Sequence, residues 1–221
     1  AIVNAFYHHF ADLLVEIIYG YRVSDEEMRE RVYFENMELL EELARKNHGV
    51  IAYLGHMCNW EWIADVGKQF MDKSIVEYNV YRKQKNAKVD HAMLLLRSKR
   101  GGECVEKNVL LRKLVQLRHV DHPYVVGLIA DQKPSPRNAH VWTTFLNQDT
   151  AFLDGGEVLA RKFGLGVVYA NITSPKRGYY HVHFELITDN PTALPENTIT
   201  LTYARMIENN ICQQPERWLW T

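Results

Sequence analysis

The spacing of apolar residues divides the chain into a helical first part and a second part that mixes strands with helices. Up to residue 48, apolar residues recur every three or four positions, as on amphipathic helices. Helices are predicted at 1–19, after Ser24 in the capping sequence Ser-Asp-Glu-Glu, and at 37–46. The first has a wide apolar face, which we expect to pack on the core; docking on a bilayer surface is the alternative.

From Gly49 onward, short apolar runs alternate with helical patterns, and such runs predict buried strands. The predicted strands are 49–54, 74–81, 124–130, 166–172 and 179–187, and the predicted helices are 61–70, 89–99, 109–119, 155–163 and 195–213. Strands that alternate with helices indicate a parallel sheet covered on both faces, and the last two strands add an antiparallel pair. We therefore expect a single α/β domain with a central mixed, mostly parallel sheet flanked by helices.

Length and composition agree with one globular domain. The 221 residues are 47% hydrophobic and 24% charged, which is ordinary for a folded protein. Lys and Arg (26) nearly balance Asp and Glu (27), so no overall positive field favours a nucleic-acid partner. Local basic clusters, among them 82–88 and 97–100, are most simply solvated surface, with contact to an anionic substrate as the alternative.

Cysteine usage and hydropathy limit the cellular setting. Cys58, Cys104 and Cys212 form no Cys-x-x-Cys pair, so neither a disulfide framework nor a zinc cluster is expected, and a reducing compartment is the simpler inference. No apolar run approaches the length of about 20 residues that a membrane-spanning helix needs. Because the chain opens in the middle of a helical pattern, we expect that an N-terminal membrane anchor is missing from it.

The most informative stretch runs from Gly55 to Glu61, where a buried strand ends and a helix is predicted to begin. In open α/β sheets ligands bind at the carboxyl ends of strands, and His56 lies at such an end. A turn between the two residues would let the Glu61 carboxylate accept the proton of one ring nitrogen, leaving the other as a base. The stretch predicts a His56–Glu61 catalytic pair; a core histidine beside an acid favoured by the helix dipole is the alternative.

Further motifs follow in order along nearly the whole chain. They are Tyr81-Arg82 with Asn86 and Asp90, Arg97 to Gly101, Ala130-Asp131-Gln132, Phe145 to Phe152, and Gln214 to Trp220. With Gly55-His56 and Asn59-Trp60-Glu61, they resemble the motifs of the bacterial lipid A late acyltransferases of the lauroyl and myristoyl type. That family has a glycerolipid-acyltransferase-like fold and a dyad of a histidine and an acid separated by four residues. The block at Phe145 departs from the family's Phe-Phe-Gly loop, and the family's basic C-terminal end is missing.

The resemblance implies transfer of a fatty acyl group from an acyl-carrier-protein thioester, or less readily from acyl-CoA, to a hydroxyl of a lipid A precursor. The setting it implies is the membrane surface at the cytoplasmic face of the bacterial inner membrane. His56 would deprotonate the hydroxyl with Glu61 as its partner. The expected substrate-binding or oxyanion residues are Asn59, Arg82, Arg97, Asp131 and Gln132, with Arg82 preferred for anion contact. No cofactor and no metal are expected.

Three alternatives remain open on the sequence alone. The acceptor could be a glycerolipid, an aminolipid or another glycolipid, because the dyad does not discriminate acceptors. The chain could be a lipid-binding domain of the same fold without turnover. A thiol hydrolase that uses Cys58 is disfavoured, because the thiol has no clear activated setting and no Gly-x-Ser-x-Gly elbow occurs.

Overall fold

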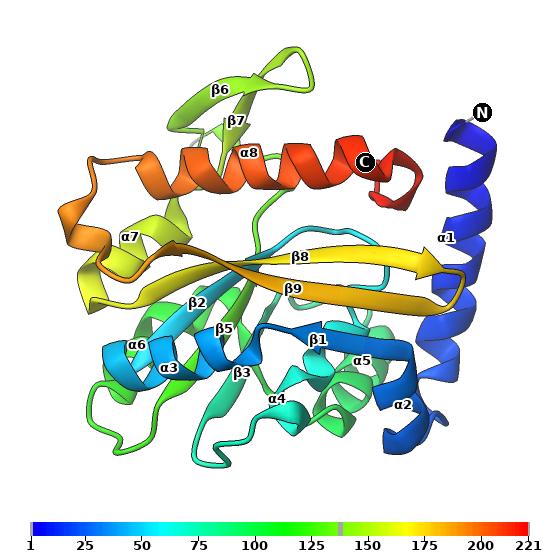
Figure 1. Ribbon diagram of the computed structural model, residues 1–221, viewed down its shortest axis with the longest axis horizontal. Helices are drawn as coiled ribbons and strands as arrows, with labels where there is room; N and C mark the ends of the chain where they lie inside the picture. The colour runs from blue at the N-terminus through cyan, green and yellow to red at the C-terminus, as the bar shows by residue number, and fades with distance from the viewer. Residues whose placement is uncertain (1, 137–138, 221) are drawn as a thin grey trace.

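A seven-stranded sheet forms the centre of the computed structural model, which describes residues 2–136 and 139–220 (Figure 1). Its strands are β1 (Val32–Glu35), β2 (Gly49–Leu54), β3 (Val76–Tyr81), β4 (Glu103–Glu106), β5 (Tyr124–Ile129), β8 (Gly166–Lys176) and β9 (Tyr179–Thr188). They lie in the order β1-β9-β8-β2-β5-β3-β4, and only the β8–β9 pair is antiparallel. The predicted mixed, mostly parallel sheet in a single α/β domain is confirmed.

Helices cover both faces of this sheet. They are α1 (Ile2–Tyr19), α2 (Asp25–Arg31), α3 (Met37–Asn47), α4 (Val66–Gln69), α5 (Ala87–Lys99), α6 (Leu110–Leu117), α7 (Gly155–Phe163) and α8 (Thr198–Gln213), with short 3-10 helices η1 (Trp62–Asp65), η2 (Lys107–Val109), η4 (Pro191–Ala193) and η5 (Pro215–Arg217). Alternate side chains of β2 point to opposite faces. The Tyr53 ring lies 4.6 Å from the Tyr203 ring of α8, whereas Leu54 lines a small cavity with Leu40 of α3. All of β2 is therefore buried, as its apolar run predicts.

Several elements differ from the predicted ones, mainly where the local signal is short. The strands β1 and β4 have four residues each and were not predicted, because so short a run carries little periodicity. The hairpin of β6 (Val141–Phe145) and β7 (Gln148–Phe152) stands outside the main sheet and was also missed. The helix predicted at 61–70 is η1 followed by one turn of α4, in which the Gly67 amide donates to Glu77.

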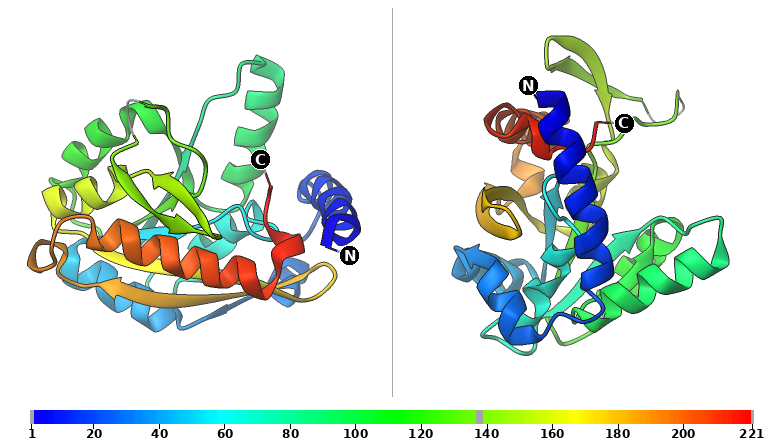
Figure 2. Two further views of the ribbon diagram at one scale, coloured as in Figure 1. Left: turned by 90° about the horizontal axis from the view of Figure 1, so that it is seen from above. Right: turned by 90° about the vertical axis from the view of Figure 1, so that its right-hand side faces the viewer.

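Helix α1 lies at the side of the domain beside η5, so the first and last parts of the described chain meet (Figures 1 and 2). Only His9 and Leu13 of this helix are buried, and Val15 and Ile18 are 66% and 70% exposed. The expectation that its wide apolar face packs on the core is therefore wrong for most of the helix. No helix among the described residues is both long and apolar enough to cross a bilayer.

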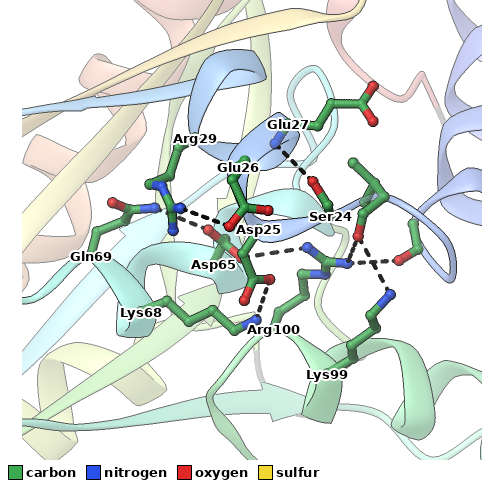
Figure 3. A network of polar contacts seen from close by, with 12 residues as sticks. Ser24, Asp25, Glu26, Glu27, Arg29, Asp65, Lys68, Gln69, Lys99 and Arg100 are labelled. Carbon is green, nitrogen blue, oxygen red and sulfur yellow. Dashed lines mark hydrogen bonds and ion pairs between the residues drawn. The ribbon is translucent and has the colours of Figure 1, made fainter.

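A polar network holds the turn between α1 and α2 against the end of α5 (Figure 3). The fully buried Arg100 side chain donates to the Gly20 carbonyl at 2.8 Å and lies 3.5 Å from the Asp65 carboxylate. Lys99 donates to the Tyr21 carbonyl at 2.7 Å, and Lys68 pairs with Asp25 at 2.6 Å. Part of the basic cluster 97–100 therefore bonds the end of α5 to the turn between α1 and α2, and the cluster is not simply a solvated surface.

Candidate active site

The sheet register brings the ends of two neighbouring strands level with each other. In the parallel pair β2–β5, Leu54 lies opposite Ile129. Two residues further along each strand, His56 and Asp131 therefore leave the carboxyl edge of the sheet side by side. Such an edge is where α/β folds place their ligands. The shared register predicts contact between the two side chains, although neither strand alone contains that information.

His56 is held by the carboxylate of Asp131 at two points. Its ring Nδ1 lies 2.6 Å from Oδ1, and its backbone N–H donates to Oδ2 at 2.7 Å. The ring keeps 18% of its surface exposed, while the carboxylate is only 1% exposed. Bonding to a carboxylate places the proton on Nδ1, which leaves Nε2 with a lone pair. Trp60 packs edge-on against the imidazole, with ring centroids 5.0 Å apart.

Glu61 does not contact His56 in the way that the sequence suggested. Its two carboxylate oxygens accept hydrogen bonds from Nε and Nη2 of Arg97 at 2.8 and 2.6 Å. The pair is largely buried, with 7% of the Glu61 side chain and 19% of the Arg97 side chain exposed. Two charge-assisted hydrogen bonds to a guanidinium hold a buried carboxylate more strongly than one hydrogen bond to an imidazole does. His56 therefore pairs with Asp131, which follows β5, and not with Glu61.

The other predicted site residues lie in different settings. Asn59 is fully buried, donates to Glu16 of α1 at 2.8 Å and accepts from the Trp62 amide at 3.3 Å, so it orders the turn after His56. Arg82 is exposed at the carboxyl end of β3. Gln132 is exposed and lines a cavity beside Asp131.

The turn after His56 has an unusual backbone at Cys58. This residue adopts a φ of 55°, which is uncommon for a side chain other than glycine, asparagine or aspartate. Its thiol is completely buried, and burial raises its pKa to about 12. A thiol in that setting is not an activated nucleophile, which argues against the hydrolase alternative.

A tryptophan that the sequence analysis did not identify completes the hydrogen bonding of Asp131. Trp218 Nε1 donates to Oδ2 of Asp131 at 2.8 Å. It belongs to the segment 215–220, here called the C-terminal segment, which runs beside the turn that follows His56. The sequence signal was the motif Gln214 to Trp220, which says nothing of the partner of Trp218.

Two cavities lie near the His56–Asp131 pair. The larger, about 770 Å³, lies between the β6–β7 hairpin, the segment after β5 and the C-terminal segment, and Asp131 is part of its lining. Its apolar lining comes mainly from Trp142, Phe145, Leu146, Phe152, Trp218 and Trp220. The smaller, about 70 Å³, lies beyond Trp60 and includes Glu61, Glu77 and Arg97. Burial raises the Glu77 pKa to about 8, so this carboxyl is protonated near neutral pH.

The described residues contain no group of three or more His, Cys, Asp or Glu side chains that could hold a metal ion. Their arrangement instead suits proton transfer: an accessible imidazole, a buried carboxylate behind it and a guanidinium nearby. The model of the family described as "Bacterial lipid A biosynthesis acyltransferase" matches residues 1–221. A comparison with curated proteins returns no match.

Proposed function

The chain belongs to the bacterial lipid A biosynthesis acyltransferase family and is an acyltransferase, and we propose that it moves a fatty acyl group from an acyl-carrier-protein thioester to a hydroxyl of a lipid A precursor. The observation that carries the proposed mechanism is the His56–Asp131 pair at the carboxyl edge of the sheet. The pair supports a general base whose reactive nitrogen faces away from its carboxylate.

In this mechanism Nε2 of His56 takes the proton of the acceptor hydroxyl. The acceptor oxygen attacks the thioester carbonyl carbon and gives a tetrahedral oxyanion. The carbon–sulfur bond then breaks, the new ester forms, and the proton on His56 passes to the departing thiolate. Asp131 stabilises the imidazolium that exists between the two proton transfers, as in other pairs of histidine and acid.

The Glu61–Arg97 pair is proposed to stabilise the negative charge that develops on the tetrahedral oxyanion. Glu61 binds Nε and Nη2 of Arg97, which leaves Nη1 as the remaining nitrogen of the guanidinium. An arginine fixed in this way loses little freedom when it contacts an oxyanion or a phosphate. In this proposal Glu61 acts by holding Arg97 in place. The sequence had suggested that it would act by orienting His56.

The larger cavity supports a place for a substrate chain. Its aromatic walls suit a saturated hydrocarbon, and its lining includes Asp131, which holds His56. Exposed cations between Arg82 and Lys88 follow the carboxyl end of β3, on the same edge of the sheet as His56. They suit an anionic partner such as the phosphorylated head of a lipid A precursor.

Helix α1 supports contact with a membrane surface. Its exposed side carries Val3, Tyr7, Val15 and Ile18. An amphipathic helix with such a side can lie in the interface of a bilayer. The proposed location is the cytoplasmic face of the inner membrane, and the exposed side of α1 and the family support it.

The test is an assay of the purified protein with acyl-carrier-protein and coenzyme A thioesters and a panel of lipid acceptors, read by mass spectrometry. His56→Ala should reduce transfer by at least about a hundredfold, as loss of a general base does. His119→Ala, an exposed histidine on another edge, is the matched control. Equal transfer by the His56 variant would end the proposal, and transfer only to another lipid would change the acceptor.

A further inference from the structure

The buried carboxylate of Asp131 accepts three hydrogen bonds, and one of them comes from outside the motifs that supply the base. The His56 ring is hydrogen-bonded to Oδ1 through Nδ1. The backbone N–H of His56 and the indole N–H of Trp218 both donate to Oδ2. With two donors on Oδ2, the carboxylate plane cannot turn without breaking a bond. Oδ1 is thereby aimed at Nδ1 of the imidazole.

Trp218 reaches this position because its segment is bonded on both sides of the His56 turn. The Cys58 amide donates to the Arg217 carbonyl at 2.8 Å, and the Leu219 amide donates to the His56 carbonyl at 3.0 Å. The two bonds place Trp218 opposite Met57 in an antiparallel bridge. The indole is thus fixed relative to the backbone that carries the histidine.

Packing holds the same ring. Its centroid lies 6.1 Å from that of Phe145 on β6 and 4.7 Å from that of Trp220, both edge-on. The ring forms part of the wall of the larger cavity. One face of the indole therefore borders the space beside the base, while its N–H points at Asp131.

We propose that Trp218 is a positioning residue for the His56 base, a role that rests on the proposed function. The indole N–H anchors the Asp131 carboxylate, and the carboxylate in turn fixes the orientation and the Nδ1–H tautomer of the imidazole. The C-terminal segment thereby takes part in catalysis without touching the reacting atoms. Such support from a fixed neighbour is what keeps a base in its productive geometry.

Most charged and titratable groups around the pair keep their charge while an imidazole titrates. Burial raises the pKa of Tyr169 on β8 and of Tyr203 on α8, and the Asp131 charge raises both further. Behind the C-terminal segment, burial and then the Arg217 charge lower the His9 pKa to about 4. Beyond Trp60, Glu61 and Arg97 stay paired. Glu77, in the same cavity, has a pKa that burial raises to about 8, so it loses its proton above neutral pH. The acidic limb of the pH profile, and a shift seen in one variant and not in the other, therefore report on His56.

The test compares Trp218→Phe with Trp220→Phe. The first keeps an aromatic ring and removes only the N–H that reaches Asp131. The second removes an N–H that donates to the Pro215 carbonyl at 2.8 Å, in a side chain that is 46% exposed. Trp218→Phe should lower kcat about tenfold with KM for the donor unchanged, as loss of one hydrogen bond to a charged group predicts. Trp220→Phe keeps an aromatic ring in the cavity wall and every hydrogen bond of Asp131, so its effect should fall on KM and leave kcat and the acidic limb of the pH profile in place.

The dependence of kcat/KM on pH separates loss of the hydrogen bond from loss of packing, because loss of packing alone would not shift the acidic limb of the profile. Without the indole, the negative charge of Asp131 is less dispersed and holds the imidazolium more strongly. The acidic limb of the kcat/KM profile should then move to higher pH in Trp218→Phe and stay in place in Trp220→Phe. A folded Trp218→Phe protein with the parent profile and the parent kcat would overturn the proposal.

A nuclear magnetic resonance titration makes the test independent of turnover. With isotope-labelled histidine, the His56 signal should titrate at higher pH in Trp218→Phe than in the parent protein. In the parent protein, one of the five indole N–H signals, that of Trp218, should follow the His56 titration, and that of Trp220 should not. An indole signal of Trp218 that ignores the titration rejects the contact even if the variant fails to fold. A positive result without any transfer would reject the proposed function alone.

Discussion

At the scale of single residues, three acids near the candidate site have three different environments. Asp131 is held by hydrogen bonds from His56 and Trp218, and Glu61 is paired with Arg97. Glu77 is buried with the Gly67 amide as a donor at 3.1 Å. The environment of each carboxyl, and not its residue type, therefore decides whether it holds an imidazole, pairs with a cation or carries a proton.

Glu77 should make the stability of the protein depend on pH. Burial raises its pKa from 4.5 to about 8, so between these values the folded chain holds a proton that the unfolded chain releases. The free energy of unfolding should therefore fall as pH rises through this window and level off above about pH 8. Glu77→Gln should remove this slope in urea unfolding measured at several pH values. The exposed Glu38→Gln should keep it, and an equal slope in all three proteins would contradict the assignment.

Breaking the Glu61–Arg97 pair on one side should cost more than removing both charges. Arg97→Met leaves a carboxylate that is 7% exposed without its partner, and should lower the free energy of unfolding by about 3 kcal/mol. The double variant Glu61→Gln with Arg97→Met should regain part of that loss, because no buried charge is left alone. Urea unfolding of the two single variants and the double variant measures this. Strict additivity would show that the two side chains do not act as a pair.

At the scale of elements, the end of β2 and the middle of α8 approach each other closely at Gly55. A Cβ placed there would lie 2.2 Å from Cδ1 of Ile207 and 3.2 Å from Oδ2 of Asp131. The Tyr203 hydroxyl of α8 also donates to the Leu54 carbonyl at 3.0 Å. The glycine before the histidine is therefore required by packing of α8 as well as by the carboxylate.

Gly55→Ala should lower both stability and transfer. The new methyl group forces the buried Ile207 side chain of α8 to move, at about 1–3 kcal/mol for an overpacked core, and crowds Asp131. Adding Ile207→Val removes the Cδ1 atom that the methyl meets, so the double variant should recover stability. Transfer should stay low, because the contact with Asp131 remains. Thermal unfolding and the transfer assay separate the two effects, and parent-like values for Gly55→Ala would contradict the close approach.

At the scale of the whole molecule, the first helix and the last segment meet beside the candidate site (Figure 2). Glu16 of α1 accepts hydrogen bonds from Asn59, in the turn after His56, and from Tyr180 of β9. The Arg217 side chain lies 3.1 Å from the His9 ring. The inner side of α1 is thus tied to the site while its outer side is exposed, so the outer side is free to face a membrane.

Negative charges introduced on the outer side of α1 should weaken binding to membranes without disturbing the candidate active site. Val15→Asp and Ile18→Asp replace side chains that are 66% and 70% exposed. Sedimentation with vesicles of phosphatidylethanolamine and phosphatidylglycerol should show severalfold weaker binding, while transfer to detergent-dispersed acceptor stays near the parent value. Met71→Asp, at a residue that is 87% exposed elsewhere, should bind like the parent. Equal binding by all variants would exclude α1 as the contact.

The apolar pattern alone predicted most of the central sheet. The run at 49–54 matches β2 residue for residue, and the predicted mixture of parallel strands with one antiparallel pair is observed. These elements are encoded locally, because a buried strand needs a continuous apolar run of its own. The four-residue strands and the β6–β7 hairpin escaped prediction, since their pairing depends on partners more than on their own pattern.

The sequence by itself identified the accessible histidine at a strand end, the acids around it and the family to which the chain belongs. Only the tertiary structure decided which acid holds His56. The spacing of five positions between His56 and Glu61 suggested Glu61 as the partner. In the structure Arg97 binds the Glu61 carboxylate instead. The β2–β5 register brings Asp131 to the His56 ring from 75 residues away. Trp218 reaches the same carboxylate from 87 residues away. Spacing along a chain governs contacts within one turn, whereas these contacts depend on strand pairing and on where the chain returns after α8.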